Sequence, residues 1–354
     1  MPDSASDVFD IPADVLQRET ARIFRGHGLL PNDADWVAEA LVEADLRGIH
    51  SHGVTRVPIY TERLARGLFN PRPNVCVVRQ GPSVVSVDGD NGMGAVVGRR
   101  AVAAAVDVVA ETGCAAVGVR NSNHFGIAAL YAEQLVAHGF IALVCSNAPP
   151  TMAPHGGRSA LFGTNPLAFG VPAPGERQIL ADMATSIVAR GKIILAQQRG
   201  EEIPLGWALD PDGRPTKDAA TALNGVVLPF GGAKGSAIAL LVDILAAVMT
   251  GAGFGTDLPD FYNDLDRPGN LGHFLLAIDP ARFGERDRFL ERLGRYINMI
   301  GDCPPAEGFE RVQLPGEVEA GLRRKHLSSG VPLSQDILLG LRQAAGHADV
   351  SLEL

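Results

Sequence analysis

Two histidines lie between two arginines in the segment DLRGIHSHGVTR, residues 45–56. A histidine that titrates near neutral pH can act as a general acid or base, and the planar guanidinium of an arginine can bind a carboxylate through two hydrogen bonds. His52 and Arg56 are four residues apart, and Gly53 between them would let a substrate approach the backbone. The segment therefore predicts an acid–base site for an anionic substrate, a metal chelate, or only a polar loop after a helix.

A metal chelate is the weakest of these alternatives. Zinc in proteins is usually held by about four nitrogen, sulfur or oxygen ligands. His124, His155 and His273 occur elsewhere in the chain, but there is no HExxH motif. The cysteines are far apart in the sequence and form no CxxC pair: Cys76, Cys114, Cys145 and Cys303. We therefore expect no bound metal and no disulfide framework.

A second histidine follows an expected strand in the segment NSNHFG, residues 121–126. In α/β proteins, ligands gather at the carboxyl ends of strands, so His124 is a candidate site residue. The alternative is a capping loop, in which Ser122 or Asn123 accepts hydrogen bonds from the first turn of the next helix. The segment alone does not decide between these readings.

Two glycine-rich segments could each place the N-terminus of a helix against a phosphate group. GMGAVVG, residues 92–98, is a relaxed form of the dinucleotide fingerprint, but the next strand ends on Arg120 instead of an acidic residue for the ribose. PFGGAKGS, residues 229–236, lacks the spacing of a P-loop, yet its glycines and Lys234 could bind an anion at a helix N-terminus. A tight turn is the alternative for both segments.

The elements around these segments alternate between helix and strand. Residues 10–48 have the pattern of two amphipathic helices, and the second is expected to begin at PNDADW, with Asn32 and Asp33 as capping residues. From about residue 83, the strands SVVSVDG, AAVGVR and IALVCSN alternate with two helices. This alternation predicts an α/β layer structure. The tail from about residue 284 is expected to be mainly helical.

Composition excludes several classes of partner. The formal net charge is −9, whereas a nucleic-acid-binding protein needs a basic face. The most apolar helix, AIALLVDILAAVM, is too short to span a bilayer and contains Asp243. The acidic first residues resemble no signal peptide, and the scattered cysteines suit a reducing compartment. We expect a cytoplasmic protein that binds neither nucleic acid nor membrane.

Seven motifs in a fixed order carry a family resemblance: SHGVTR, RNSNHFG, PHGGR, FGTNP, DMATS, PFGGAKGS and NLGHFLLAIDP. Together they resemble the type-2 malate/L-lactate dehydrogenase family, from the first helices to about residue 330. That family includes ureidoglycolate, sulfolactate and diketogulonate dehydrogenases and the Δ1-piperideine/pyrroline-2-carboxylate reductases. The resemblance implies an NAD- or NADP-dependent oxidoreductase with the family's own non-Rossmann α/β fold. This fold has a mixed sheet with flanking helices, plus a helical domain from both chain ends. The resemblance also implies that GMGAVVG is a structural turn.

The resemblance further implies roles for individual residues. His52, with Ser51 beside it, would be the proton donor or acceptor, Arg56 would hold the substrate carboxylate, and His124 would join them as a catalytic residue. The expected cofactor contacts are Thr164, Asn165, Ile179, Leu180, Ala181, Asp182, Met183, Ala184, Ala233, Lys234, Gly316, Glu317 and Val318. Many relatives have His or Tyr where this chain has Ala233.

The resemblance also suggests how the chain is divided. We expect residues 1–75 and about 284–354 to form one helical dimerisation domain, and residues 76–283 to bind cofactor and substrate. A subdivision near residues 120–150 is a further option. Family members are homodimers, so the active site is expected near the subunit interface.

The expected reaction transfers a hydride between NAD(P) and C2 of a small 2-hydroxy or 2-oxo carboxylic acid of the malate or lactate type. One alternative is an NAD(P)H-dependent reductase of a cyclic 2-imino acid, which Ser236 and the motif PHGGR favour by resemblance. For an imine, which is already protonated, His52 would have a more positional role. Another alternative is a non-catalytic ligand-binding homologue, although such a protein has no need of His52 and Arg56.

Overall fold

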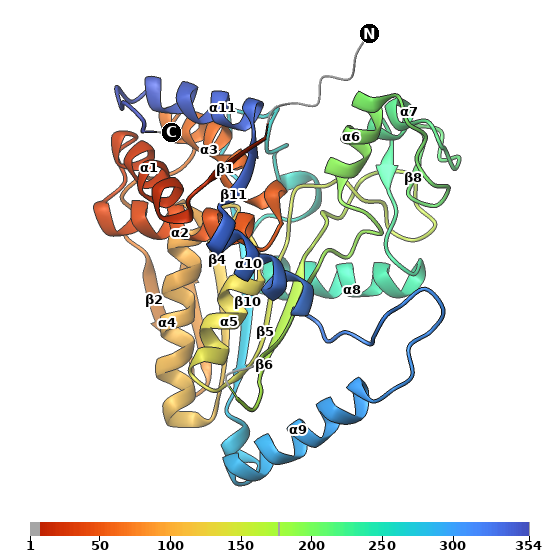
Figure 1. Cartoon of the computed structure of the whole chain (residues 1–354). Helices are drawn as coiled ribbons and strands as arrows, with labels where there is room; N and C mark the ends of the chain where they lie inside the picture. Colours follow the sequence, from red (N-terminus) through yellow and green to blue (C-terminus); the bar gives the residue numbers. More distant parts are fainter. Residues whose placement is uncertain (1–7, 176–177, 354) are drawn as a thin grey trace.

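A seven-stranded mixed sheet forms the centre of the molecule (Figure 1). The computed structural model describes residues 8–175 and 178–353. In their spatial order, the strands are β2 (Cys76–Arg79), β3 (Val84–Asp88), β4 (Cys114–Ser122), β10 (Leu271–Ile278), β5 (Ile141–Ser146), β6 (Leu167–Pro172) and β7 (Gln178–Met183). Only β3 and β4 are parallel neighbours, and the other adjacent pairs are antiparallel. A Rossmann sheet is mostly parallel, so the expected mixed, non-Rossmann fold is confirmed.

Strand direction brings the polar segments to one edge of this sheet. Strands β4 and β5 both run antiparallel to β10, and β7 runs in the same direction as β5 because β6 reverses the chain between them. The carboxyl ends of β4, β5 and β7 therefore share an edge. His124 follows β4 at this edge, and Asp182 lies in the last part of β7.

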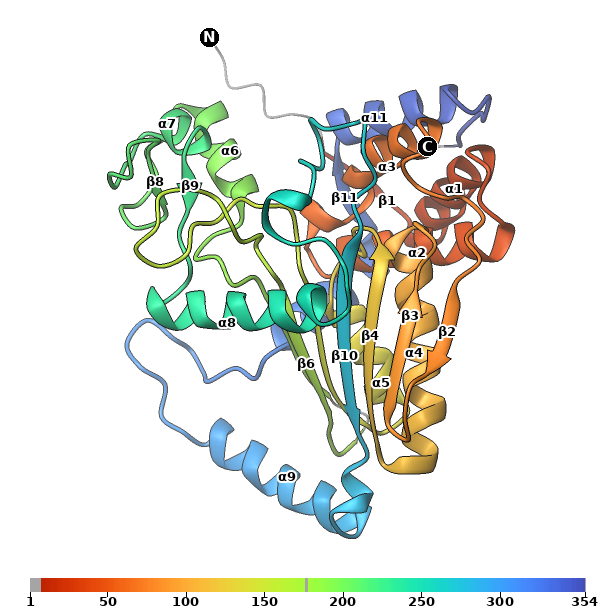
Figure 2. The ribbon, with the colours of Figure 1, turned by 180° about the vertical axis from the view of Figure 1, so that it is seen from behind.

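Helices cover both faces of the sheet. Helices α4 (Gly94–Thr112) and α5 (Ala129–Ala137) pack on the face seen in Figure 1, and α8 (Ala233–Asp243) crosses the opposite face in Figure 2. Gly98 allows α4 and α5 to approach closely, because a Cβ atom there would lie 2.5 Å from the ring of Tyr131. A Cβ atom on Gly94 would overlap the main chain of Asn123 and His124. The glycines of GMGAVVG thus seat the start of α4 against the loop after β4.

The two ends of the chain meet in a helical layer at the same edge. Its elements are β1 (Val8–Ile11), α1 (Ala13–Gly26), α2 (Pro31–Leu46), α3 (Val57–Ala65), α10 (Glu317–Ser329), β11 (Val331–Ser334) and α11 (Gln335–Gly346). Strands β1 and β11 pair antiparallel, and α11 packs on α1 and α3. Elements from both chain ends therefore lie in one helical layer.

The start of α2 differs from the prediction. The helix begins at Pro31, with Leu30 as the N-cap residue, and no side chain caps it. Asp33 instead accepts a hydrogen bond from Arg99 of α4 at 2.7 Å. Proline at the first helical position has no backbone N–H that needs a partner, and the Asp33 N–H bonds to the carbonyl oxygen of Leu30 at 3.0 Å.

Two further parts lie outside the sheet and the helical layer. Helices α6 (Arg190–Arg199) and α7 (Ala219–Leu223), with strands β8 (Ala208–Leu209) and β9 (Val226–Val227), form a small lobe with its own apolar core. Helix α9 (Arg286–Gly301) lies near the end of the sheet away from the helical layer (Figures 1 and 2). Across the described residues, no helix has the length and apolarity needed to cross a membrane.

Candidate active site

The segment DLRGIHSHGVTR folds as a tight loop held by the buried carboxylate of Asp45. After α2, two short 3₁₀ turns, His50–His52 and Val54–Arg56, lead into α3. Asp45 accepts hydrogen bonds from the backbone N–H of Val54 at 2.7 Å and from Nδ1 of His50 at 2.8 Å. Burial raises the pKa of Asp45, although both hydrogen bonds act in the opposite direction. The last turn of α2 therefore fixes the loop that presents His52.

Gly53 has a different role from the predicted one. Its φ of −87° is accessible to any residue, but a Cβ atom on it would fall within the carboxylate of Asp45. The space beside Gly53 is therefore filled by a protein side chain and does not admit a substrate. His50 has a defined partner in the same carboxylate.

His52 and His124 stack on each other where the helical layer meets the sheet. Their ring centroids are 5.3 Å apart, with an angle of 28° between the rings. Burial and the nearby charge of Arg56 lower the pKa of His52 to about 3. Burial, with Arg56, His52 and His273 as further causes, lowers the pKa of His124 well below its usual value. Both imidazoles are therefore neutral at neutral pH in the protein without ligands.

The capping alternative for NSNHFG is wrong. The Ser122 hydroxyl lies 2.8 Å from Nε2 of His273, and the Asn123 amide donates to the carbonyl oxygens of Asn91 and Gly92. Neither side chain caps α5, whose N-cap residue is Ala128. These bonds tie the loop after β4 to neighbouring segments and so fix the position of His124.

Arg56 lies in this site as a cation without an anionic partner. Its Nε donates to the carbonyl oxygen of Ser51 at 2.6 Å, and its guanidinium lies 5.5 Å from the ring centroid of Tyr262 and bonds to the hydroxyl of that tyrosine. Within the described chain, no carboxylate forms a salt bridge with Arg56. Burial lowers the pKa of Arg56. An anionic ligand would supply the missing counter-charge.

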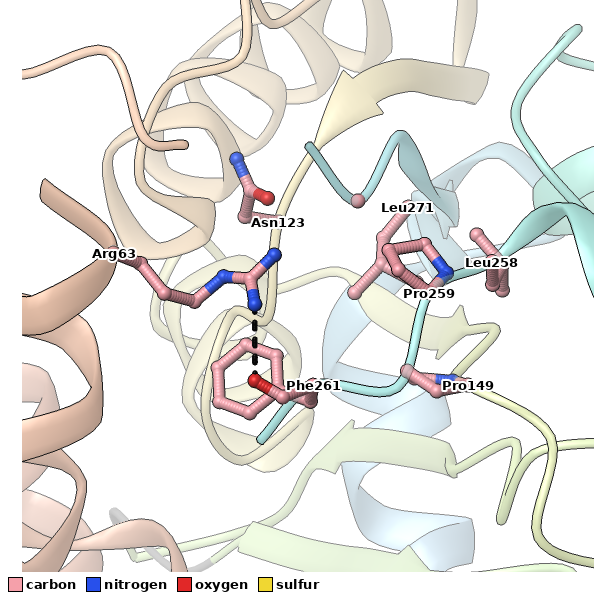
Figure 3. A pocket seen from close by; sticks show the side chains of 8 residues that line it. Arg63, Asn123, Pro149, Leu258, Pro259, Phe261 and Leu271 are labelled. Atoms are coloured by element: carbon pink, nitrogen blue, oxygen red, sulfur yellow. Dashed lines mark hydrogen bonds between the residues drawn. The ribbon is translucent and has the colours of Figure 1, made fainter. Parts of the chain in front are cut away.

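The loop that carries Phe261 and Tyr262 is anchored by a buried arginine (Figure 3). Arg63 donates to the carbonyl oxygens of Phe261, Asp264 and Arg267 at 3.0 to 3.2 Å. The Phe261 ring centroid lies 5.7 Å from that of His124. A cavity of about 10 Å³ beside Arg63 has room for roughly one water molecule. The loop thus closes one side of the histidine pair.

Tyr60 is a site residue that sequence reasoning missed. Its hydroxyl lies 2.6 Å from Nδ1 of His124. Arg56, Tyr60 and Arg63 are spaced as i, i+4 and i+7, which places them on one face along α3. That spacing was the available signal, but an aromatic residue in a helix is also typical of an ordinary core position.

A large groove begins beside the two histidine loops. Its volume is about 550 Å³, within the usual range of ligand pockets. Ile49, three residues before His52, and Ala129, five residues after His124, both line it. Five of the predicted cofactor residues also line it: Ile179, Leu180, Asp182, Gly316 and Glu317. The structure therefore brings these five together in one groove, whereas His52, Arg56 and His124 are not among the residues that line it.

The wall of this groove needs a glycine at position 316. Gly316 has a φ of +91°, and a Cβ atom on it would lie 2.7 Å from the carbonyl oxygen of Leu180. The Leu180 N–H donates to the carbonyl oxygen of Pro315 at 3.1 Å, so this segment lies directly along β7. Four arginines also line the groove: Arg47, Arg311, Arg323 and Arg324. Three of them already pair with carboxylates, Arg47 with Glu43 and Glu133, Arg311 with Glu317, and Arg323 with Glu43.

Asp182 lines the groove, and its pKa is raised. Its Oδ2 accepts a hydrogen bond from the backbone N–H of Ala129 at 2.8 Å, at the start of α5. Burial raises its pKa to about 6, and hydrogen bonds from α5 act in the opposite direction. The carboxylate is near the loop of His124 and could accept hydrogen bonds from a ligand's hydroxyl groups.

The remaining predicted cofactor residues do not line this groove. The main chains of Thr164, Thr185 and Phe230 are joined by hydrogen bonds of 2.8 and 3.0 Å, so FGTNP, DMATS and PFGGAKGS lie side by side. The Asn165 amide is buried and bonds to main-chain groups of Ala148 and Ala239. None of the following is among the residues that line the groove: Thr164, Asn165, Ala181, Met183, Ala184, Ala233, Lys234 and Val318.

No metal site accompanies these features in residues 8–175 and 178–353, where no group of three or more His, Cys, Asp or Glu side chains could hold an ion. The histidine pair contacts aromatic rings, a serine and a tyrosine, and His50 contacts Asp45. The chemistry that this arrangement supports is proton transfer to or from a bound anion.

Comparisons with known proteins agree over most of the chain. A profile of the malate/L-lactate dehydrogenase family matches residues 11–342. The chain is 36% identical to an L-sulfolactate dehydrogenase of Methanocaldococcus jannaschii over 331 residues, which cover 94% of this chain and 95% of the relative. It is 39% identical to an NADP⁺-dependent (2R)-3-sulfolactate dehydrogenase of Chromohalobacter salexigens, with 83% and 85% covered. It is 35% identical to an NAD⁺-dependent ureidoglycolate dehydrogenase of Escherichia coli K12, with 88% of each chain covered.

Superposition on solved structures agrees with these sequence comparisons. The sulfolactate dehydrogenase of Methanocaldococcus jannaschii superposes with a TM-score of 0.92 at 34% identity, covering 98% of this chain and 99% of that one. A Δ1-piperideine-2-carboxylate reductase from Pseudomonas syringae superposes with a TM-score of 0.86 at 33% identity, covering 95% and 100%.

Proposed function

The chain belongs to the malate/L-lactate dehydrogenase family, and from this premise we propose that it is an NAD- or NADP-dependent dehydrogenase of a small 2-hydroxy or 2-oxo carboxylic acid. One observation supports the proposal most strongly. His52 stacks on His124 at 5.3 Å, and the unpaired cation Arg56 lies beside them. This arrangement suits an acid with a carboxylate next to the reacting carbon.

His52 is the proton donor or acceptor in this proposal, and Arg56 binds the carboxylate. Before the substrate binds, burial and Arg56 keep His52 neutral. A bound carboxylate cancels the charge of Arg56 and so favours the protonated form of His52. The Ser51 hydroxyl, 3.0 Å from Nδ1 of His52, can then accept a hydrogen bond from the Nδ1–H of the protonated ring. Substrate binding and protonation of His52 are thereby coupled.

The groove between β7 and α10 is the proposed cofactor site. Ile179, Leu180 and Gly316 would hold the dinucleotide against the main chain, and Asp182 and Glu317 offer oxygens for its hydroxyl groups. When bound, the nicotinamide would supply or accept the hydride at C2 of the substrate. The relatives named above include one NADP⁺ enzyme and one NAD⁺ enzyme, so the proposal covers both cofactors.

Reduction of a cyclic 2-imino acid is the second candidate. A solved Δ1-piperideine-2-carboxylate reductase shares 33% identity with this chain. The two motifs that favour this reading also meet in space, because the His155 N–H of PHGGR donates to the hydroxyl of Ser236 at 3.0 Å. Gly232 of the same glycine-rich loop lies beside the His155 ring. A substrate comparison must rank the two candidates.

The proposal includes a homodimer in the cytoplasm. Helix α8 and the π-helical turn after it (Ile244–Val248) expose large apolar side chains: Leu240, Leu241, Ile244, Val248 and Met249. An exposed apolar stripe of this kind is typical of a surface that a protein partner covers. The four cysteines are unpaired, which suits a reducing compartment.

The deciding experiment measures oxidation of NADH and of NADPH with oxaloacetate, pyruvate or Δ1-piperideine-2-carboxylate. Turnover of a 2-oxo acid supports the main proposal, and faster turnover of the imine supports the second candidate. If the folded protein oxidises neither cofactor with any of these substrates, both are contradicted. Binding of each reduced cofactor is followed separately by its fluorescence, which distinguishes failed binding from failed chemistry.

A further inference from the structure

His52 and His124 are stacked and chemically alike, but their hydrogen-bond partners differ. We propose that the Tyr60 hydroxyl locks His124 as a neutral imidazole with its proton on Nε2, so that only His52 of the pair exchanges protons. Tyr60 is then a positioning residue that acts through His124. The inference rests on the proposed function for its catalytic meaning, but the hydrogen-bond lock can be tested without cofactor or substrate.

The direction of the Tyr60–His124 hydrogen bond follows from burial. Tyr60 is 3% exposed, and its oxygen is 2.6 Å from Nδ1 of His124. In the part of the chain that the structure describes, this hydroxyl has no other hydrogen-bond partner. If His124 donated from Nδ1, the hydroxyl proton would be buried without an acceptor, which costs more than an unused lone pair. Tyr60 therefore donates, Nδ1 accepts, and the ring proton is on Nε2.

Protonation of His124 would place two donors against each other. A proton on Nδ1 would point at a hydroxyl that already donates to it, and the Tyr60 ring is packed edge-on against Phe69 and Phe261. The charged and titratable groups that face His124 from the neighbouring elements are Arg56, His52, His273 and Tyr60. None of them is an anion, so nothing in the surroundings stabilises an imidazolium at this position.

His52 is under no such constraint. Its Nδ1 lies 3.0 Å from the hydroxyl of Ser51, which is exposed and can rotate. The hydroxyl donates to the neutral ring and accepts from the protonated ring, so both states of His52 are satisfied. Two stacked imidazolium rings at 5.3 Å would repel each other, so only one of the pair can hold a proton. The hydrogen-bond partners of the two rings, Ser51 for His52 and Tyr60 for His124, favour protonation of His52.

This division separates two functions within the pair. His52 gives or takes the proton at the substrate oxygen. His124, with its Nδ1 edge turned to Tyr60, keeps an Nε2–H on the other edge as a permanent hydrogen-bond donor. A donor that never titrates remains available to the substrate oxygen at every pH at which His52 works.

Nitrogen NMR of ¹⁵N-histidine-labelled protein, without cofactor or substrate, tests the lock. His124→Gln and His52→Gln variants assign the two rings. We expect His124 to show the Nε2–H tautomer and no titration between pH 5 and 8. In Tyr60→Phe, which keeps the buried ring, we expect mixed tautomers for His124. Tyr131→Phe is the matched control, because the Tyr131 hydroxyl is also buried but donates to the Phe125 carbonyl. It should leave the His124 signals unchanged.

An Nδ1–H tautomer in the unaltered protein, titration of His124 in this range, or identical His124 signals in Tyr60→Phe would overturn the inference. In the active enzyme, Tyr60→Phe should lower kcat about tenfold while leaving the substrate KM nearly unchanged, as expected for loss of a partner that orients an imidazole. If no substrate is turned over but the NMR result holds, the proposed function fails and the lock stands.

Discussion

The carboxylate of Asp45 occupies the space that a Cβ atom on Gly53 would need. Asp45 is completely buried and binds both the Val54 N–H and the His50 ring, so it is fixed in that position. The glycine between His52 and Val54 is therefore required by the packing of a buried anion, because its own backbone angles are ordinary. The position of the proposed acid is thus set from within α2.

Gly53→Ala should consequently impair catalysis. The added methyl group must displace either Asp45 or the His52 loop, and a shift of about 1 Å in a catalytic group can cost roughly 100-fold in rate. We expect kcat to fall by about this factor while reduced-cofactor binding, measured by fluorescence, is retained. Gly81→Ala is the control, because a Cβ atom at Gly81 meets no neighbour within 4 Å. Equal activity of the two variants would contradict the role assigned to Asp45.

Binding of a 2-oxo acid should be accompanied by proton uptake. The pKa of His52 is about 3 without ligand, so His52 is unprotonated at pH 7. Burial is the larger cause of this depression and Arg56 the smaller, and an anion on Arg56 removes the smaller one and so raises the pKa. Calorimetry in buffers of different ionisation enthalpy should show uptake of a fraction of a proton, increasing as the pH is lowered towards 6.

His52→Ala provides the test of that assignment. This variant should bind the substrate without the proton uptake and should lose turnover. A buffer-independent enthalpy in the unaltered protein would contradict the coupling, and unchanged turnover in His52→Ala would remove the residue from the mechanism.

Arg56→Lys should weaken the binding of the substrate more than the binding of the cofactor. Lysine keeps the charge but loses the planar fork that binds a carboxylate through two hydrogen bonds, and it also loses the Nε bond to Ser51. We expect the substrate KM to rise about 10-fold to 100-fold, the equivalent of one charged hydrogen bond of about 1.5–3 kcal/mol. Arg66→Lys, on the same helix in an exposed pair with Glu62, should change KM by less than about twofold. Similar effects of both changes would show that only surface charge matters.

Local patterns predicted three strands of the sheet, β3, β4 and β5, and the first part of the site. The strands around His124 were visible because their apolar runs alternate with helices, and His52 and Arg56 were visible because they are near each other in sequence. The pairing of β1 with β11 was not, because it joins short segments from opposite ends of the chain. Strand β2 was also missed, since all four of its residues are exposed and show no alternation.

The missed site residues share one physical reason. Tyr60 and Phe261 are aromatic residues whose local sequence is typical of core packing, and only the folded chain shows that both contact His124. The role of Asp45 was hidden in the same way, since an acidic residue near the end of a helix is usually exposed. Partners that act through space leave no periodic signal in the sequence.

His273 predicts how stability depends on pH. It is fully buried between the hydroxyls of Ser122 and Ser146, and burial lowers its pKa to about 3. The unfolded chain binds this proton below about pH 6.5, whereas the folded chain does not until about pH 3. Above pH 6.5, His273 is neutral in both states and does not change the free energy of unfolding. Below pH 6.5, only the unfolded chain binds the proton, and the free energy of unfolding falls by about 1.4 kcal/mol per pH unit. Asp182 and Asp243, whose pKa values are raised to about 6, act in the opposite direction as the pH falls.

A comparison with His273→Gln isolates this contribution from that of the carboxyl groups. Glutamine is less stable in this position at pH 7, because it fits the two serines less well, but it has no proton to bind on unfolding. In denaturant titrations between pH 6.5 and 5, we expect the difference in unfolding free energy between the two proteins to shrink by about 1.4 kcal/mol per pH unit. Parallel pH profiles would show that His273 does not remain neutral in the folded protein. A gap that widens towards low pH would mean that the folded protein binds the His273 proton more tightly than the unfolded chain does.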